Sequence, residues 1–313
     1  MKKLIDYSFV IPVFNSDKSL LELYNRIKAE FQDSNFEIIF VEDHGIDQSW
    51  NLICEISKND SRVKGYKLAK NFGQHNALLC GVRNAAGEFT ITLDDDLQHP
   101  PECIHLLLSK LNEGYDLVYG PPKSEKHGVF RDIASKAYKT ILKNSMDGIS
   151  VQKMSALRVF KTELRKSFKK YDAASVYLDL LLSWSTSNIT YLEVSHEKRK
   201  YGNSGYTMSK LIMHALNLSI SFSTKPLKIA TSLGFLMAIF GALILMYILL
   251  QWSLYGSSVP GFFFLASIIA IFSGAQLIAI GIIGEYISRI FRKILGEPPF
   301  IIKESTISNV KTR

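Results

Sequence analysis

Three consecutive carboxylates, Asp94, Asp95 and Asp96, follow an alternating β-type run at 89–93. If the strand stays extended through the acids, Asp94 and Asp96 point to one face and Asp95 to the other. Two carboxylates about 4 Å apart repel by roughly 4 kcal/mol at an effective dielectric near 20, so a close pair needs a cation or a shared proton. Mg²⁺ or Mn²⁺ suits this role, because it prefers oxygen ligands and also binds substrate phosphates. The alternative is an exposed acidic turn that caps the helix opened by the following prolines.

Strands and helices alternate along the first part of the chain. Apolar runs bounded by turn residues predict strands, and helical spacing with capping residues predicts helices. The predicted strands are 7–13, 36–41, 63–68, 89–93, 116–120 and 189–194, with helices at 18–31, at 48–57 and up to 86. Short loops between alternating strands and helices favour an α/β fold with a doubly wound, mainly parallel sheet.

Acidic residues gather where such a sheet binds ligands, beyond the carboxyl ends of its strands. Besides the turn at 94–96, the second predicted strand ends in Glu42 and Asp43. No G-x-G-x-x-G or G-x-x-x-x-G-K follows any strand, so the chain lacks the dinucleotide and P-loop fingerprints. Strand-end acids with a metal suit an NDP-sugar better than ATP or NAD.

The last third of the chain is apolar enough to cross a membrane. No Asp, Glu, Lys or Arg occurs between Lys228 and Glu285. The segments 227–250 and 262–283 each approach the roughly 20 residues that span a bilayer. The alternative is a buried hairpin of a soluble protein. Basic residues flank the two segments but not their connecting loop, which predicts an inner (cytoplasmic) membrane protein with residues 1–207 and both termini in the cytoplasm.

Four parts follow from these patterns. Residues 1–207 form the predicted cytosolic domain, 208–226 an amphipathic juxtamembrane helix, 227–284 two transmembrane helices, and 285–313 a basic amphipathic helix and cytosolic tail. A core helix would share the spacing of 208–226, but its position favours a helix along the bilayer. The net charge of +8 is concentrated beside the apolar segments, which favours anionic lipid headgroups over nucleic acid. Three cysteines without metal-ligand spacing predict reduced thiols.

Such a domain on a membrane hairpin implies a lipid substrate with an anionic head. A phosphate monoester carries about −1.5 to −2 charge at neutral pH, so it can attack a sugar carbon without a strong general base. The main catalytic task is then to stabilise the departing nucleotide diphosphate, which a metal on Asp94 and Asp96 would do. Lys and Arg would hold the attacking phosphate. A basic run from Lys123 to Lys143 is a candidate, although a solvated helix face has the same pattern.

The sequence resembles the polyprenyl-phosphate glycosyltransferases of family 2 over almost its whole length. The most specific motif is D-x-D-L-Q-x-P-P-E at 94–102, and further motifs stand at 10–15, 42–43, 71–75, 202–206, 222–227 and 284–287. The resemblance implies a GT-A fold, an NDP-sugar donor (UDP-sugar first), Mg²⁺ or Mn²⁺, a polyprenyl (undecaprenyl) phosphate acceptor and inversion at the anomeric carbon.

The resemblance also implies three groups of site residues. Asp94 and Asp96 are expected to be catalytic, and the metal ligands to be Asp94, Asp96 and Gln98. The expected nucleotide-sugar contacts are Pro12, Asn15, Asp43, Asn71, Asp94 and Asp95. The expected acceptor-phosphate contacts are Arg131 and Arg199, to which the basic run adds Lys123. The family's Asp before the strand at 156–160 is missing, since residues 152–155 read Gln-Lys-Met-Ser. This departure favours the mechanism without a carboxylate base.

Two other functions share parts of the pattern. A processive polysaccharide synthase has the same fold but needs more than two spans to form a conduit. A membrane scaffold or flippase component would keep the fold with vestigial acids. The motifs do not select the sugar, for which glucose and 4-amino-4-deoxyarabinose derivatives are the leading options. The oligomeric state is also left open, and a homo-oligomer is one option.

Overall fold

The computed structural model describes residues 5–123, 153–174, 176–197, 200–201, 225–255 and 261–307. The chain divides into two compact units. The first comprises Met1–Thr207 together with Gly296–Arg313, and the second is Met208–Leu295. Arg131, Arg199 and most of the predicted juxtamembrane helix lie outside the described residues.

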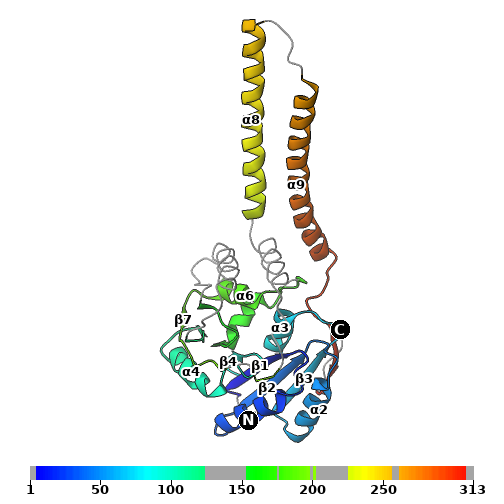
Figure 1. Ribbon diagram of the computed structural model, residues 1–313. Coiled ribbons are helices and arrows are strands. Elements are labelled where there is room, and N and C mark those ends of the chain that lie inside the picture. The colour runs from blue at the N-terminus through cyan, green and yellow to red at the C-terminus, as the bar shows by residue number, and fades with distance from the viewer. Residues whose placement is uncertain are drawn as a thin grey trace. The chain divides into compact units, whose positions relative to one another are not determined.

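The first unit contains one mixed sheet of eight described strands in the order β7-β5-β6-β4-β1-β2-β3-β8 (Figure 1). β1, β2, β3 and β4 pair in parallel, as do β5 and β7, whereas β6 and β8 run antiparallel to their neighbours. The predicted doubly wound, mainly parallel sheet is therefore confirmed. The strands are β1 (Tyr7–Val13), β2 (Phe36–Glu42), β3 (Val63–Leu68), β4 (Phe89–Thr92), β5 (Leu117–Tyr119), β6 (Arg158–Lys161), β7 (Ile189–Tyr191) and β8 (Ile302–Ser305).

Helices cover both faces of this sheet. Two apolar clusters form the core: one contains α1, α2 and α4, and the other contains α3, η3 and α6. All seven residues of β2 are buried, as expected of a central strand covered on both faces. The helices are α1 (Leu20–Glu30), α2 (Ser49–Asn59), α3 (Gln74–Asn84), η1 (Pro101–Cys103), α4 (Ile104–Asn112), η3 (Thr162–Phe168) and α6 (Leu178–Ser185).

β1 and β2 continue past the end of β4, which opens the carboxyl edge of the sheet. β4 pairs with β1 only up to Val10↔Thr92, whereas the carbonyl of Val13 accepts the N–H of Asp43, the residue directly after β2, at 2.9 Å. The backbone groups of successive strand residues point to opposite neighbouring strands. Pro12 points to the side of β4, which has already ended, so its missing N–H removes no hydrogen bond from the sheet. The turn after β4 occupies this position.

The sequence did not predict β8. Ile302–Ser305 carries too little apolar alternation to indicate a strand, yet it pairs with the edge strand β3. Trp50 Nε1 donates to Glu304 at 3.1 Å, and Gly65 exchanges hydrogen bonds with Thr306. The chain after the apolar helices is thus part of the first unit, where it covers an otherwise open sheet edge.

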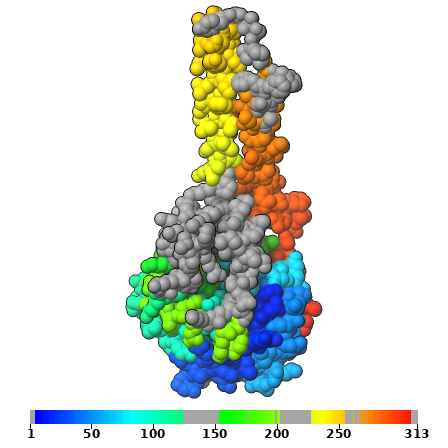
Figure 2. Space-filling model, viewed as in Figure 1, coloured from blue at the N-terminus to red at the C-terminus, as the bar shows by residue number. Residues whose placement is uncertain are grey.

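The second unit is built from α8 (Lys225–Tyr255) and α9 (Phe262–Ile294), which lie side by side in yellow and orange in Figure 2. Leu227–Leu254 and Ile271–Ile294 are long and apolar enough to span a bilayer. A Cβ on Gly241 would lie 3.1 Å from Phe272 Cζ, so the glycine allows α8 close approach to α9. Large apolar side chains face outward, among them Phe235 at 70% exposure. Such exposure fits a lipid environment.

Candidate active site

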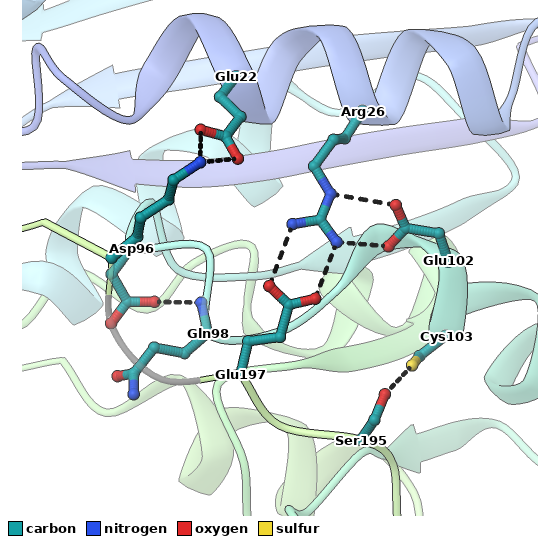
Figure 3. Close-up of polar contacts among 9 residues, drawn as sticks. Glu22, Arg26, Asp96, Gln98, Glu102, Cys103, Ser195 and Glu197 are labelled. Atoms are coloured by element: carbon teal, nitrogen blue, oxygen red, sulfur yellow. Dashed lines mark hydrogen bonds and ion pairs between the residues drawn. The ribbon is translucent and has the colours of Figure 1, made fainter.

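The three carboxylates after β4 lie on a turn rather than on an extended strand. β4 ends at Thr92, and Leu97 adopts a left-handed backbone with φ of 63°. The expectation that the strand stays extended, with Asp94 and Asp96 on one face, is therefore wrong. Asp96 instead accepts the N–H of Gln98 at 3.1 Å, a local turn contact that aspartate favours (Figure 3). The turn brings all three carboxylates to the carboxyl edge.

Left-handed residues follow each of the three central strands. Asn15, His44 and Leu97 have φ of 54°, 57° and 63°, after β1, β2 and β4. Asn and His tolerate this conformation, but for a buried leucine it is a strained outlier. Backbone strain of this kind gathers at ligand sites, where packing around it holds the conformation. Its clustering makes the carboxyl edge the candidate functional side of the sheet.

Asp94 and Asp95 connect the turn to two other loops. Gln74, the first residue of α3, donates its amide to Asp94 Oδ1 at 2.6 Å. The backbone N–H of Phe14 donates to Asp95 Oδ2 at 3.2 Å. Loss of solvent raises the pKa of Asp95 to about 6, although hydrogen bonds from Ser16 and Phe14 oppose the shift. The middle carboxylate therefore fixes the loop after β1, while Asp94 meets the beginning of α3.

Asp43 fixes a third loop. Its two carboxylate oxygens accept the N–H groups of Phe72 and Gly73 at 2.7 and 2.8 Å. Burial raises the pKa of Asp43, and these hydrogen bonds oppose that shift. Gly73 has φ of 93°, a conformation that favours glycine. This arrangement sets the position of Gln74, which directly follows Gly73 and contacts Asp94.

Glu42 is the unusual member of this edge. It is 1% exposed; Oε1 accepts the N–H of Gly45, but Oε2 has no hydrogen-bond partner among the described residues. Burial raises the pKa of Glu42. Asn15 lies beside it, with Oδ1 accepting the N–H of Ile46 at 2.8 Å. A buried acceptor without a donor is costly, so Glu42 Oε2 is suited to an N–H of a ligand.

The sequence-predicted residues fall into two groups in space. Asn15, Asp43, Asp94, Asp95, Asp96 and Gln98 share the carboxyl edge, with Pro12 buried beneath it and Asn71 exposed on the loop after β3. Lys123 is exposed after β5, and its N–H donates to Val194. Two further residues of this edge were missed, Gln74 and Phe14, which is 51% exposed, and Glu42 was noted only as a strand-end acid without a binding role. Each stands inside or beside a motif, but its contacts depend on tertiary structure.

The donor set fits a hard divalent cation only in part. Asp94, Asp96 and Gln98 supply side-chain oxygens on one short turn, and such oxygens are the ligands that Mg²⁺ and Mn²⁺ prefer. Among the described residues, no three His, Cys, Asp or Glu side chains are grouped closely enough to enclose a metal. A cation here would therefore need oxygens from a bound phosphate.

Comparison with known proteins gives agreement over nearly the full chain. The undecaprenyl-phosphate 4-deoxy-4-formamido-L-arabinose transferase of Shewanella sediminis (strain HAW-EB3) is 33% identical over 307 residues, covering 96% of this chain and 92% of the relative. The transferase of the same name from Proteus mirabilis (strain HI4320) is 31% identical over 308 residues, covering 97% and 94%. A similar solved structure is S. aureus TarS 1-349 in complex with UDP-GlcNAc, with a TM-score of 0.47, 20% identity, and 69% and 66% of the two chains covered.

The family profile described as glycosyl transferase family 2 matches residues 8–171, which is more than half of the chain. The match includes β1 to β6 and therefore the whole acidic edge. Together with the mixed sheet, it confirms the GT-A-type fold class and the resemblance seen in the motifs. The chain belongs to glycosyltransferase family 2.

Proposed function

We propose that this protein is a membrane-bound inverting glycosyltransferase that moves a sugar from an NDP-sugar, first a UDP-sugar, to polyprenyl (undecaprenyl) phosphate. The observation that carries the proposal is the convergence of the 94–96 turn, Asn15 and Glu42 at one sheet edge of a family 2 chain with two candidate membrane spans. The acceptor is supported by the relatives that match nearly the whole chain, which are undecaprenyl-phosphate transferases by name.

The nucleotide lies at the carboxyl edge in this proposal. Glu42 Oε2, which has no hydrogen-bond partner in the described part of the chain, accepts an N–H of the nucleobase, and the exposed Phe14 gives the base an apolar surface. Pro12, Asn15, Asp43, Asn71 and Asp95 shape the loops around the nucleotide. Because Asp43 already accepts two backbone N–H groups, its contribution is to hold the loop that carries Gln74.

Asp94, Asp96 and Gln98 would hold Mg²⁺ or Mn²⁺. When bound, the cation neutralises charge on the departing nucleotide diphosphate. Gln74 orients Asp94 through its 2.6 Å hydrogen bond, and Asp43 in turn fixes the position of Gln74. This chain of contacts holds one carboxylate in place before substrate binds, so that less ordering is needed at the moment of reaction.

The acceptor phosphate attacks the anomeric carbon as the bond from that carbon to the diphosphate oxygen breaks. A single displacement inverts the configuration, and a phosphate that is already ionised needs no residue to remove a proton. Lys123, Arg131 and Arg199 hold the acceptor phosphate. In this proposal the apolar helices cross the inner (cytoplasmic) membrane, with the catalytic domain and both termini in the cytoplasm.

The test is transfer by the purified full-length protein in lipid nanodiscs, with undecaprenyl phosphate and a panel of UDP-, GDP- and dTDP-sugars, with and without EDTA. We expect one donor to give a lipid-phosphate sugar, EDTA to abolish its formation, and Asp96→Asn to lower kcat/KM by about 100-fold or more, the loss typical of a removed transition-state charge contact. Glu163→Gln is the matched control, because it alters an exposed pair with Lys166. Undiminished transfer by Asp96→Asn would refute the assignment of the turn.

A further inference from the structure

We propose that Arg26 is a positioning residue that fixes the segment after β7 against the turn after β4. The inference rests on the proposed function, because this segment leads into the basic residues around Lys200 that flank an acceptor-phosphate candidate. Nothing in the motifs points to Arg26: it lies in the middle of α1, outside every motif of the family resemblance.

The Arg26 guanidinium binds two carboxylates from distant parts of the chain (Figure 3). Its Nε and Nη2 donate to Glu102 at 3.0 and 2.8 Å, a bidentate pair with the last residue of the D-x-D-L-Q-x-P-P-E motif. Its Nη1 and Nη2 donate to Glu197 at 3.5 and 3.2 Å. Planar, bidentate pairing of this kind holds direction as well as distance. The Arg26 side chain thus joins α1, η1 at the end of the acidic motif, and the segment after β7.

Two further contacts extend the attachment. The backbone N–H of Glu197 donates to the carbonyl of Gln98 at 2.9 Å. The hydroxyl of Ser195 lies 3.0 Å from Cys103 Sγ, where either group can donate. The segment 195–197 therefore runs along residues 98–103, which include η1, and Gln98 is in direct contact with it. A shift of this segment would move a proposed metal ligand, and a shift of the turn would move the segment.

α1 also binds the segment on the far side of the undescribed positions 198 and 199. Lys200 Nζ contacts both carboxylate oxygens of Glu22 at 2.9 and 2.8 Å. Glu22 and Arg26 are four residues apart and share one face of α1. The helix therefore holds the chain at Glu197 and again at Lys200.

Charge makes this attachment depend on Arg26. Glu102 and Glu197 are about half exposed, at 47% and 52%, and both approach Nη2 of a guanidinium that is 23% exposed. Without the guanidinium, two carboxylates would lie near each other without a cation, and they would repel. Removal of Arg26 should therefore release the segment 195–197 from the turn, and removal of one carboxylate as well should restore part of the attachment.

The first experiment measures steady-state kinetics of Arg26→Met, Glu197→Gln and the double variant in nanodiscs, with a UDP titration for donor affinity. Glu30→Gln is the control, because Glu30 also joins α1 to α4 through His105 at 3.3 Å. We expect Arg26→Met to raise KM for undecaprenyl phosphate about tenfold, the effect of losing charged hydrogen bonds, with UDP affinity changed far less. Glu197→Gln should have a smaller effect, and the double variant should recover part of the loss.

The second experiment needs no activity. Ser195→Cys places a thiol opposite Cys103, so mild oxidation should form a disulfide, and Arg26→Met should slow its formation severalfold while Glu30→Gln should not. Equal trapping and equal acceptor KM with and without Arg26 would overturn the inference, provided that both proteins melt normally; a misfolded Arg26→Met leaves Glu197→Gln to decide. If the wild type made no lipid-phosphate sugar, the proposed function would fail while the disulfide rates still tested the positioning role.

Discussion

β2 carries a glutamate near each end, and the two have opposite environments. Glu37, near the amino end, is 1% exposed and satisfied: Ser8 Oγ and the N–H of Ala86 each donate at 2.6 Å, and Lys64 pairs with its other oxygen. Glu42, at the carboxyl end, is equally buried, but its Oε2 has no hydrogen-bond partner among the residues that the structure describes. The same residue type on one strand thus stabilises the fold at one end and leaves an unused acceptor at the other.

The difference is what the proposed function expects, because a ligand at the carboxyl edge would supply the missing partner. Left-handed residues follow β1, β2 and β4 there, and three aspartates crowd one turn. The amino edge contains no comparable strain among the described strands. Stability and binding are therefore separable by mutation, and the two ends of the sheet should respond with different signs.

Glu37→Gln should have the largest effect on stability. It weakens a buried pair with Lys64 and leaves donors around position 37 poorly matched, at a cost of about 3 kcal/mol. We expect Tm in detergent to fall by about 10 °C, with unchanged nucleotide affinity in the folded protein. Differential scanning fluorimetry measures the shift, and Glu113→Gln, which alters an exposed pair with Lys110, is the control. If Glu37→Gln had the Tm of the wild type, Glu37 would not stabilise the fold and the contrast with Glu42 would fail.

Asp60, just before the amino end of β3, forms a separate ion pair with Arg62 that gives stability a pH dependence. Arg62 lowers the pKa of Asp60 to about 2, from 3.8, although burial opposes the shift. A carboxyl whose pKa is lowered in the folded state stabilises the fold at pH values above its unfolded pKa. Asp60 therefore adds about 2 kcal/mol to the free energy of unfolding above pH 4, and this contribution is lost as the pH falls toward 2.

Thermal melts from pH 5 to pH 2 should therefore show a steeper loss of Tm for the wild type than for Asp60→Asn. The amide also accepts hydrogen bonds but cannot titrate, so it serves as the reference. If Tm fell equally with pH in the two proteins, the ionised carboxylate of Asp60 would not contribute to stability.

Glu42→Gln should lower nucleotide affinity without lowering Tm, the opposite of Glu37→Gln, and it should have the smallest effect on the fold. The amide can still accept the N–H of Gly45, and it relieves the cost of a buried carboxyl without a partner, so Tm should stay the same or rise. Affinity for UDP should fall about tenfold, as expected when a charged acceptor of one ligand N–H is lost. Calorimetric titration measures this. A fall in Tm with unchanged UDP affinity would make Glu42 structural, like Glu37.

Local sequence signals predicted most of the sheet. The predicted strands 7–13 and 63–68 agree with β1 (Tyr7–Val13) and β3 (Val63–Leu68), because apolar runs bounded by turn residues are a local property. β8 was missed since its stability comes from pairing with β3 and not from its own composition. The end of β4 was misplaced because the left-handed Leu97 gives no signal in a leucine.

The motifs located the acidic edge but not the contacts that organise it. Asn15, Asp43 and Asp94 to Asp96 were named from the sequence, and the structure places them together. The partner of Asp94 is 20 residues away, and the two carboxylates on Arg26 are 76 and 171 residues away. Pairing over such separations depends on the fold, which a linear pattern does not show. Gln74, Arg26 and the oxygen of Glu42 that is unpaired among the described residues therefore required the structure.

Mn²⁺ binding, followed by electron paramagnetic resonance with and without UDP, tests the role of the carboxyl edge most directly. The wild type should bind one Mn²⁺ far more tightly when UDP is present, since the turn lacks the ligands to enclose a cation alone. Asp96→Asn should weaken this binding by about 100-fold, while Glu37→Gln should leave it unchanged at temperatures where that variant is folded. Equal Mn²⁺ affinity in the wild type and Asp96→Asn would show that the acidic turn is not the metal site.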